Sequence, residues 1–379
     1  MTAVTDDPTA GQDASDASAA ARGAPPPAGR WPLRTRALVA ATALWALFTV
    51  LGYALSGRWW LWLLPDLAPP PFFLLVPAVL LPLTWWAVPV RRWLTAALVL
   101  LLVLGAPRAG VNWSALTPGG GPVSARGDTL KVFSWNTLYW DSSDDPGEFY
   151  RYLKAKDADV YLLQEYLAWE DDGPQEIDEL ARIRAEFPGY EVEVLGELVT
   201  LSRFPVVATP PVGPSRAPGS GGPWREVFAR DKVLRTDVDV RGRVVSFYNA
   251  HVPVQLDIER SPLSGGFYRT VRERDAQRRA HFAALEKDAA ANTHPVLISG
   301  DFNTTPSMRD IGGLRDTFRD ALPASGDLLP GTWNTAGLGL WRLDWTFTDD
   351  GLRVHRYAFT DPAGLSDHRG QDLLVSLAP

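Results

Sequence analysis

Six short stretches of this chain carry polar side chains where apolar runs end. The sharpest is Val296-Leu-Ile-Ser-Gly-Asp-Phe-Asn, in which an apolar run reaches a glycine and is followed by Asp301 and Asn303. Alternate residues of an extended segment face the same side, so these two side chains can converge on one small object. A carboxylate beside a neutral amide can orient and deprotonate a water molecule. The alternative is an ordinary turn, which Gly-Asp and Asn-Thr also favour.

Four of the other five stretches place reactive side chains at or near the ends of predicted strands, and the fifth places Asp344 inside one. Their polar residues are Asn136, Glu165, His251, Asp344 and the Asp367-His368 pair. An apolar strand that ends on a carboxylate, as at Glu165, is typical of a ligand for a hard metal ion. Asp344 stands between Leu343 and Trp345, so we expect it to be buried and paired. Each stretch alone also fits a structural role, since exposed acids after strands and structural histidines are common.

The donor atoms of this set favour a hard divalent cation. Asn136, Glu165 and Asp367 offer oxygen, and the chain contains no cysteine and 5 histidines. These donors suit Mg²⁺, with Mn²⁺ or Ca²⁺ as alternatives, better than zinc. The lack of cysteine also excludes disulfides and thiolate chemistry.

In this order the motifs resemble the endonuclease/exonuclease/phosphatase superfamily. That superfamily includes DNase I-like and exonuclease III-like nucleases, inositol polyphosphate 5-phosphatases and neutral sphingomyelinases. The resemblance covers about residues 130–379 and rests on the segments WN at Asn136, QE at Glu165, LSRFP at 201–205, GDFN at Asp301 and Asn303, the Asp344 segment, and SDH at Asp367 and His368. It implies a DNase I-like α/β fold, a four-layer sandwich in which helices flank two mixed sheets.

The resemblance also implies a one-step attack of water on phosphorus. Glu165 would bind the metal ion, supported by Asn136 and Asp367. Asp301 would activate the water molecule, and Asn303 would hold it in line. A bound metal ion in such a site polarises the phosphoryl oxygen and offsets developing charge.

The histidines would then act on the phosphate. His368, oriented by Asp344, would stabilise or protonate phosphate oxygens, and His251 would donate to the phosphate or the leaving group. Arg230 is a candidate phosphate contact. Some nucleases of the family carry an asparagine shortly after the position of His251, where this chain has Val254. This difference favours a DNase- or sphingomyelinase-like site over an exonuclease III-like one.

Short apolar strands and amphipathic helices must position these residues. Strands are predicted at Leu130–Trp135, Val160–Gln164, Val192–Val194, Leu198–Ser202, Val233–Val240, Val244–Ala250, Val296–Gly300, Trp341–Thr348 and Leu373–Leu377. Helices are predicted at Pro146–Ala155, Ile177–Ala185, Phe267–Asn292 and Met308–Gly313. The mixture, with neighbouring strand pairs, predicts a layered α/β domain over residues 130–379.

The first third of the chain has a different composition. We expect a disordered cytoplasmic tail at 1–36, a transmembrane region at 37–107 and a linker at 108–129. Three apolar runs, 37–55, 71–90 and 93–106, are candidate membrane helices, and a span needs about 20 residues. A cleaved signal peptide is the rival interpretation of the first run, but that run is long and a second run follows it.

The arginines indicate how these helices are oriented. Positively charged residues favour the cytoplasmic side, which places Arg30, Arg34, Arg36 and the Arg91-Arg92 pair there. If all three runs cross the bilayer, the α/β domain lies outside the cell, and this is the topology we expect. If the third run, the shortest, only lies in the interface, the domain stays inside.

Charge bears on the substrate. Residues 130–379 hold 28 Lys and Arg against 38 Asp and Glu, a net charge of −10, whereas nucleic-acid binding needs a basic surface. We therefore favour a lipid-linked or head-group phosphate at the outer membrane surface. Three-helix anchors on such a domain also resemble membrane proteins associated with glycopeptide resistance, which suggests cell-wall lipid intermediates. An extracytoplasmic nuclease and a catalytically idle membrane-binding module are the alternatives.

Overall fold

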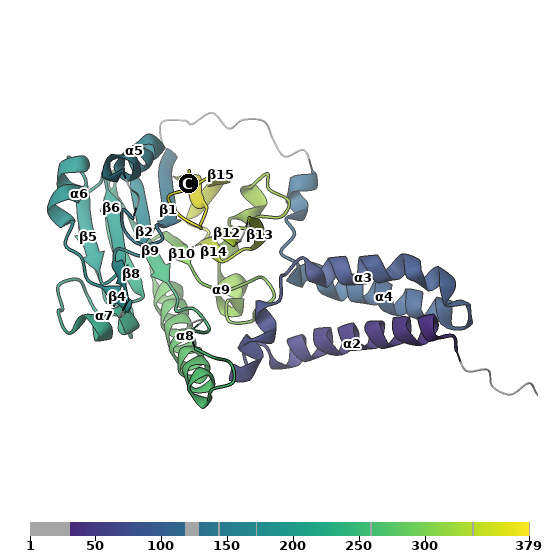
Figure 1. The fold of residues 1–379 in the computed structure, drawn as a ribbon. Helices are drawn as coiled ribbons and strands as arrows, with labels where there is room; N and C mark the ends of the chain where they lie inside the picture. Colours follow the sequence, from purple (N-terminus) through teal and green to yellow (C-terminus); the bar gives the residue numbers. More distant parts are fainter. Residues whose placement is uncertain are drawn as a thin grey trace, which may run out of the picture.

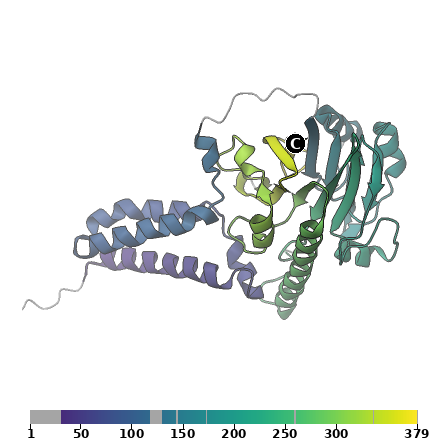
Figure 2. The same ribbon diagram turned by 180° about the vertical axis from the view of Figure 1, so that it is seen from behind.

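The computed structural model describes residues 31–117, 129–142, 145–171, 173–257, 260–335 and 337–378. Figures 1 and 2 show a helical N-terminal region that projects from one side of an α/β domain. Most of the predicted tail, residues 1–30, and most of the predicted linker, residues 118–128, lie outside the described residues.

Two six-stranded sheets form the centre of the α/β domain. The first has the order β15-β16-β1-β2-β6-β5 and the second the order β11-β14-β10-β9-β8-β7. The strands of the first are β1 Thr129–Asn136, β2 Val160–Gln164, β5 Glu191–Leu195, β6 Leu198–Ser202, β15 Leu352–Thr360 and β16 Gly370–Leu377. Those of the second are β7 Val206–Ala208, β8 Val233–Val240, β9 Arg243–His251, β10 Val296–Asp301, β11 Arg319–Asp320 and β14 Asp344–Thr348. β1 pairs in parallel with β2, and β9 with β10, among antiparallel neighbours, so both sheets are mixed.

Helices cover the outer face of each sheet. α5 (Pro146–Lys156) and α6 (Leu180–Glu186) pack on the first sheet, and α8 (Gly265–Ala291) and α9 (Gly312–Thr317) on the second. The alternation of side chains along the strands explains the layers. Val132 of β1 joins Phe247 in the core between the sheets, while Trp135 faces outward onto Phe149 of α5. The predicted four-layer α/β sandwich is confirmed.

Several boundaries differ from the prediction. The predicted strand Trp341–Thr348 is divided: Trp341 ends β13 (Leu338–Trp341), which forms a hairpin with β12 (Trp333–Thr335), and β14 begins at Asp344. The predicted helix Met308–Gly313 is wrong, because α9 begins only at Gly312. The elements that the sequence did not predict are α7 (Trp224–Arg230), β3 (Ala168–Glu170), β4 (Gly173–Gln175), β7, β11, β12 and β15.

The N-terminal region contains α2 (Leu33–Leu55), α3 (Phe72–Leu83) and α4 (Arg91–Gly105). By length and composition two segments could cross a membrane, Leu33–Leu55 and Val88–Arg108. The pair Trp60–Leu67 and Phe72–Trp86, bent by 59°, would make a third if it forms one span. The predicted second helix, 71–90, is too long, since α3 ends one residue after Pro82 and gives way to 3-10 turns.

Hydrogen bonds from Asn112 hold the end of the N-terminal region against the α/β domain. Asn112, within the predicted linker, donates from Nδ2 to the carbonyls of Leu322 (3.0 Å) and Ser325 (2.8 Å). Its backbone N–H donates to the Leu328 carbonyl at 2.9 Å. The described start of the predicted linker is therefore held against the domain.

Candidate active site

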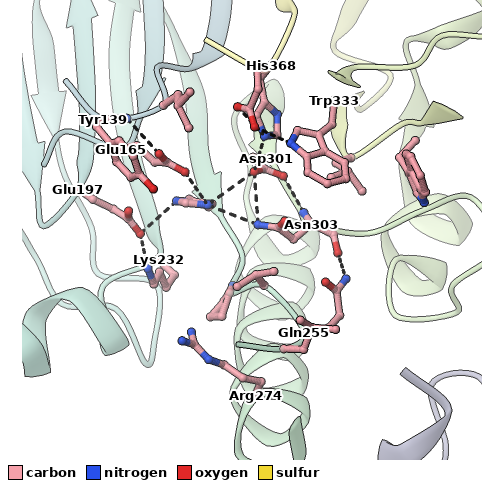
Figure 3. A pocket seen from close by; sticks show the side chains of 18 of the residues that line it. Tyr139, Glu165, Glu197, Lys232, Gln255, Arg274, Asp301, Asn303, Trp333 and His368 are labelled. Carbon is pink, nitrogen blue, oxygen red and sulfur yellow. Dashed lines mark hydrogen bonds and ion pairs between the residues drawn. The ribbon is translucent and has the colours of Figure 1, made fainter. Parts of the chain in front are cut away.

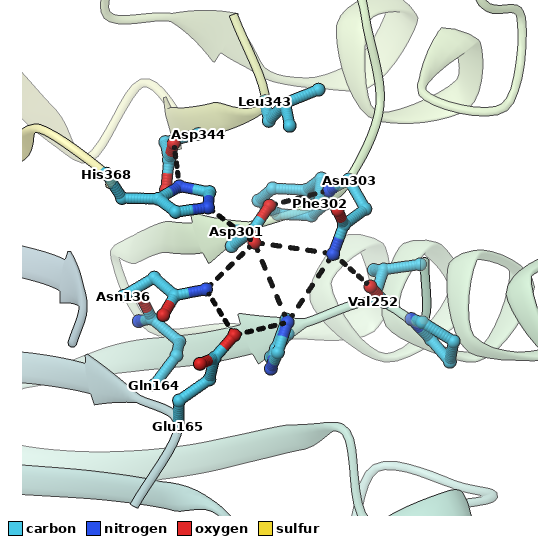
Figure 4. Close-up of polar contacts among 12 residues, drawn as sticks. Asn136, Gln164, Glu165, Val252, Asp301, Phe302, Asn303, Leu343, Asp344 and His368 are labelled. Carbon is cyan, nitrogen blue, oxygen red and sulfur yellow. Dashed lines mark hydrogen bonds and ion pairs between the residues drawn. The ribbon is translucent and has the colours of Figure 1, made fainter. Parts of the chain in front are cut away.

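Asp301, the last residue of β10, lies at the centre of a polar cluster (Figure 4). Its side chain is 1% exposed. Oδ1 accepts the backbone N–H of Asn303 at 2.8 Å, and Oδ2 accepts the side-chain amide of Asn136 at 3.1 Å. Burial raises the pKa of Asp301 to about 6, although His368 opposes the shift.

The residues beside Asp301 explain its position. Gly300 has φ +151°, and a Cβ atom there would lie 1.9 Å from the carbonyl oxygen of Ala250 on the parallel strand β9. Only glycine allows the two strands to approach this closely. Asn303 adopts φ +46°, a left-handed conformation that asparagine tolerates, and its Nδ2 donates to the Val252 carbonyl at 3.0 Å. The Gly-Asp-Phe-Asn sequence thus fixes both polar side chains at the edge of the sheet.

His368 lies on one side of Asp301 and is held by Asp344. Its Nδ1 is 2.9 Å from Asp344 Oδ2, and its Nε2 is 3.7 Å from Asp301 Oδ2. Asp344 is fully buried and opposite Asp301 in the β10–β14 register. Burial lowers the pKa of His368, but the Asp344 and Asp301 carboxylates outweigh it and raise the pKa to about 10. The expected pairing of Asp344 with His368 is present.

His251 occupies the opposite side and has a carboxylate of its own. Its Nδ1 is 3.1 Å from Oε1 of Glu197, and its Nε2 is 3.6 Å from Asp301 Oδ2. Glu197 also contacts the ammonium group of Lys232, and all three side chains are buried. Burial lowers the pKa of His251, but the Glu197 carboxylate more than compensates and the pKa is raised. Two carboxylate–histidine pairs therefore converge on Asp301.

Glu165 stands at the end of β2, where the chain turns sharply. It has φ +64°, a conformation that is costly for a residue with a side chain. Its Oε1 accepts the Asn136 amide at 2.9 Å, and its Oε2 accepts the backbone N–H of Tyr139 at 3.1 Å. Beneath it, Gln164 Nε2 donates to Asn249 Oδ1 at 2.7 Å and joins the two sheets. The turn is thus supported from both sheets.

Asp367 has one carboxylate oxygen bound and one without a donor. Its Oδ2 accepts the indole N–H of Trp333 at 2.7 Å. Its Oδ1 is buried and has no hydrogen-bond partner among the described residues. A buried carboxylate oxygen without a donor is costly unless another group, such as a cation, occupies the space beside it.

The three predicted ligands differ in how well their donor atoms suit a divalent cation. Glu165 and Asp367 line the same pocket, and both offer carboxylate oxygen, as a hard cation requires. Asn136 fits less directly, because its Nδ2 faces Glu165 and Asp301 while its Oδ1 accepts the N–H of Leu138. The oxygen donors are compatible with a divalent ion at this position. So is Asp367 Oδ1, which lies 3.9 Å from His368 Nε2 and accepts no hydrogen bond among the described residues. Asp301, Asp344 and His368 form a further group, with ligand atoms within 4.8 Å of one another.

The site opens into a pocket of about 520 Å³. Figure 3 shows Glu165, Asp301, Asn303 and His368 around it, together with Lys232 and Arg274. All the predicted catalytic residues except Asp344 line this pocket, and Asp344 lies behind His368.

The prediction for Arg230 is not supported. Arg230 ends α7, its guanidinium pairs with Asp231, and it is not among the residues that line the pocket. The cations of the pocket are Lys232 and Arg274 instead.

Sequence reasoning did not identify Glu197, Lys232, Arg274, Tyr139 and Trp333. A signal existed for one of them, because Lys232 immediately precedes β8. Glu197 lies in the short turn between β5 and β6, where the sequence indicates an exposed residue.

A model of the Endonuclease/Exonuclease/phosphatase family matches residues 133–368, a range that includes every predicted site residue. A search of curated proteins gives no significant match. Among solved structures, an endonuclease/exonuclease/phosphatase from Beutenbergia cavernae is 16% identical with TM-score 0.47, covering 66% of this chain and 72% of that one. A mannosyl-6-phosphatase from Bacteroides thetaiotaomicron is 17% identical with TM-score 0.45, covering 66% and 100%. The catalytic domain of Xenopus laevis APE2 is 16% identical with TM-score 0.46, covering 66% and 94%.

Proposed function

The chain belongs to the endonuclease/exonuclease/phosphatase family, and we propose that it hydrolyses a phosphoester with a bound divalent metal ion. One observation carries the proposal. The buried carboxylate of Asp301 lies between His251 and His368, each within 3.7 Å of its Oδ2 and each backed by its own carboxylate. This arrangement provides a base and two proton donors around one small volume.

The side chains divide the reaction between them. Asp301 takes a proton from water, whose oxygen attacks phosphorus as the ester P–O bond breaks. Its pKa of about 6 leaves it ionised yet basic near neutral pH. Asn303, 3.3 Å from Asp301 Oδ2, holds the water in place. His251 or His368, kept protonated by its carboxylate, supplies a proton to the departing oxygen.

Glu165 and Asp367, supported by Asn136, are the residues that would hold the metal ion, for which we propose Mg²⁺. A divalent ion held there would supply Lewis-acid polarisation of a phosphoryl oxygen and would offset the negative charge of the transition state. Lys232 and Arg274 add positive charge on the pocket wall and attract the phosphate group.

We place the protein in the cell membrane with its α/β domain outside the cell. The support is the pair of helices long and apolar enough to span, the bent third pair, and the arginines at the predicted cytoplasmic ends. An odd number of spans from a cytoplasmic N-terminus leaves the domain outside.

The substrate that we propose is a phosphoester carried by a membrane lipid. The α/β domain has a net charge of −10, which opposes binding along a polyanionic strand. Attachment to membrane helices instead keeps the pocket close to lipid head groups.

Purified full-length protein in detergent, supplied with Mg²⁺, tests the activity. Phosphate or head-group release from lipid phosphoesters is expected, with no cleavage of duplex DNA. Asp288→Asn is the matched control for Asp301→Asn, because Asp288 pairs with Arg235 and does not line the pocket. DNA cleavage without hydrolysis of any lipid phosphoester would overturn the substrate assignment.

The absence of cysteine allows a clean test of topology. A single cysteine at the exposed Ser220 should react with a membrane-impermeant maleimide in intact cells. A single cysteine at Ser18 should react only after permeabilisation. The reverse pattern would place the domain in the cytoplasm.

A further inference from the structure

The connection between α2 and α3 forms part of the active-site pocket. It consists of two 3-10 turns, Trp60–Leu63 and Pro65–Leu67. Leu67 lines the pocket, and its carbonyl accepts the indole N–H of Trp341, another lining residue, at 3.0 Å. A segment that joins two candidate membrane helices thus contributes a wall to the catalytic pocket.

Helix α8 links this connection to the polar part of the pocket. Near its N-terminus Phe267 and Val271 pack against Leu63. Arg274 follows Val271 by three residues and therefore lies on the same side of the helix, where it lines the pocket (Figure 3). In the described part of the chain its guanidinium has no hydrogen bond or ion pair. One face of α8 thus contacts the connection through Val271 and carries the unpaired guanidinium of Arg274 into the pocket.

The lining of the pocket has two parts. The polar part is the site described above. The other part is apolar, and within it we define the apolar wall as Leu67, Pro253, Val254, Leu256, Trp341 and Leu343. Leu256 packs against the cluster of Leu63, Phe267 and Val271, so the wall is continuous with the connection. Val254 is 43% exposed, so the wall reaches the surface. A phosphate group gains nothing from such a wall, whereas a hydrocarbon chain gains by leaving water.

We propose that the apolar wall binds the hydrocarbon chain of the lipid phosphoester, with Leu67, Leu256 and Trp341 as the residues that determine this specificity. This inference rests on the proposed phosphoesterase activity. The phosphate lies between the polar part of the pocket and the cations Lys232 and Arg274. The hydrocarbon chain lies along the apolar wall toward the connection. In the proposed topology the connection is at the outer bilayer surface, so the chain need not cross open water to reach the pocket.

The aromatic rings of the pocket could also stack on bases of a single strand. The charge of the domain and the position of Leu67 favour the lipid. A nucleic-acid strand that passed through the pocket would meet the apolar wall, which is joined to the membrane helices. That wall offers no cation to the phosphates of the nucleic acid.

Chain-length dependence tests the inference on full-length protein in detergent. Two series of substrates, alkyl phosphates and alkyl nitrophenyl phosphates, run from ethyl to hexadecyl and are assayed with Mg²⁺. We expect kcat/KM of the wild type to rise by up to roughly fourfold for each methylene that the wall buries. In Leu67→Gln and, independently, Leu256→Gln, the hexadecyl-to-ethyl preference should fall by at least about tenfold. Leu329→Gln, at an exposed leucine outside this pocket, should keep the full preference.

The outcomes separate the inference from the proposed function. A flat chain-length profile in a wild type that hydrolyses the ethyl esters overturns the inference alone. So does an unchanged preference in both pocket variants, or equal loss with both chain lengths. Cleavage of single-stranded DNA in preference to every alkyl ester also overturns it. No hydrolysis of any ester, or equal hydrolysis by Asp301→Asn, overturns the proposed function itself.

Discussion

Asp344→Asn removes the charge that holds His368 without removing the bulk of the side chain. Asp344 Oδ2 lies 2.9 Å from His368 Nδ1, and both side chains are buried. Two unit charges about 4 Å apart interact by roughly 4 kcal/mol at an effective dielectric constant of about 20. A change of about 1.4 kcal/mol in activation free energy changes the rate tenfold. Because the proposed reaction uses the charged imidazole, loss of this interaction should lower the rate by roughly a thousandfold.

The raised pKa of His368 determines the direction in which the pH profile should shift in Asp344→Asn. The pKa of His368 is raised to about 10 in the folded protein, against about 6.5 for an unperturbed histidine. A raised pKa contributes stability that is complete below about pH 6.5 and is lost as the pH rises toward 10. In Asp344→Asn both the alkaline limb of kcat/KM and this pH-dependent stability should move toward neutral pH.

The assay is hydrolysis of a nitrophenyl phosphoester over a range of pH, with thermal unfolding in EDTA as the structural measurement. Asp288→Asn is the matched control and should keep the wild-type profile, since Asp288 lies outside the pocket. A loss of less than about tenfold, with the alkaline limb unmoved, would refute the assignment of Asp344 as the residue that orients and charges His368.

Three further substitutions probe the support of the site. Gly300→Ala should lower the free energy of unfolding by at least about 3 kcal/mol in thermal denaturation, since its Cβ would lie 1.9 Å from the Ala250 carbonyl oxygen. Glu197→Gln should cost roughly 3–5 kcal/mol by leaving Lys232 buried without its partner, and adding Lys232→Met should restore most of it; no recovery would contradict the pairing. Glu165→Gln should weaken Mg²⁺ binding by more than about tenfold in calorimetry, and an unchanged affinity would exclude Glu165 as a ligand.

Strand ends carried most of the information that the sequence offered about the site. Apolar runs marked the ends of the strands that carry Asp301 and His251, whereas the grouping of these residues with Asp344 came from the family resemblance. In the structure Asp301 is opposite Asp344 in one strand pair and opposite His251 in the other. Local patterns of this kind predict the layered α/β arrangement, but the parallel pairing of β9 with β10 was not predicted, because it depends on contacts between distant segments. The weakly patterned β15, with several polar and partly exposed residues, gave no such signal.

The residues that were missed depend on contacts between distant parts of the chain. Glu197 occupies a tight turn, a position that in sequence indicates an exposed residue, yet packing against His251 buries it. Arg230 was expected to contact the phosphate, but it ends α7, a helix that was not predicted, and its guanidinium pairs with Asp231. The contact of Leu67 with Trp341 spans 274 residues of sequence, and no local pattern predicts it.

The decisive measurement compares phosphoester hydrolysis by wild-type and Asp301→Asn protein, each full length, with Mg²⁺ and in ¹⁸O-labelled water. Asp301 is the buried carboxylate at which both histidines converge and the base that we propose, and its amide analogue keeps the shape of the side chain. We expect the wild type to release phosphate or phosphoester that carries one labelled oxygen, and Asp301→Asn to lose at least about a hundredfold in rate while retaining its thermal stability. Turnover by Asp301→Asn at the wild-type rate, or label in the alcohol instead of the phosphate, would contradict water attack on phosphorus at this site.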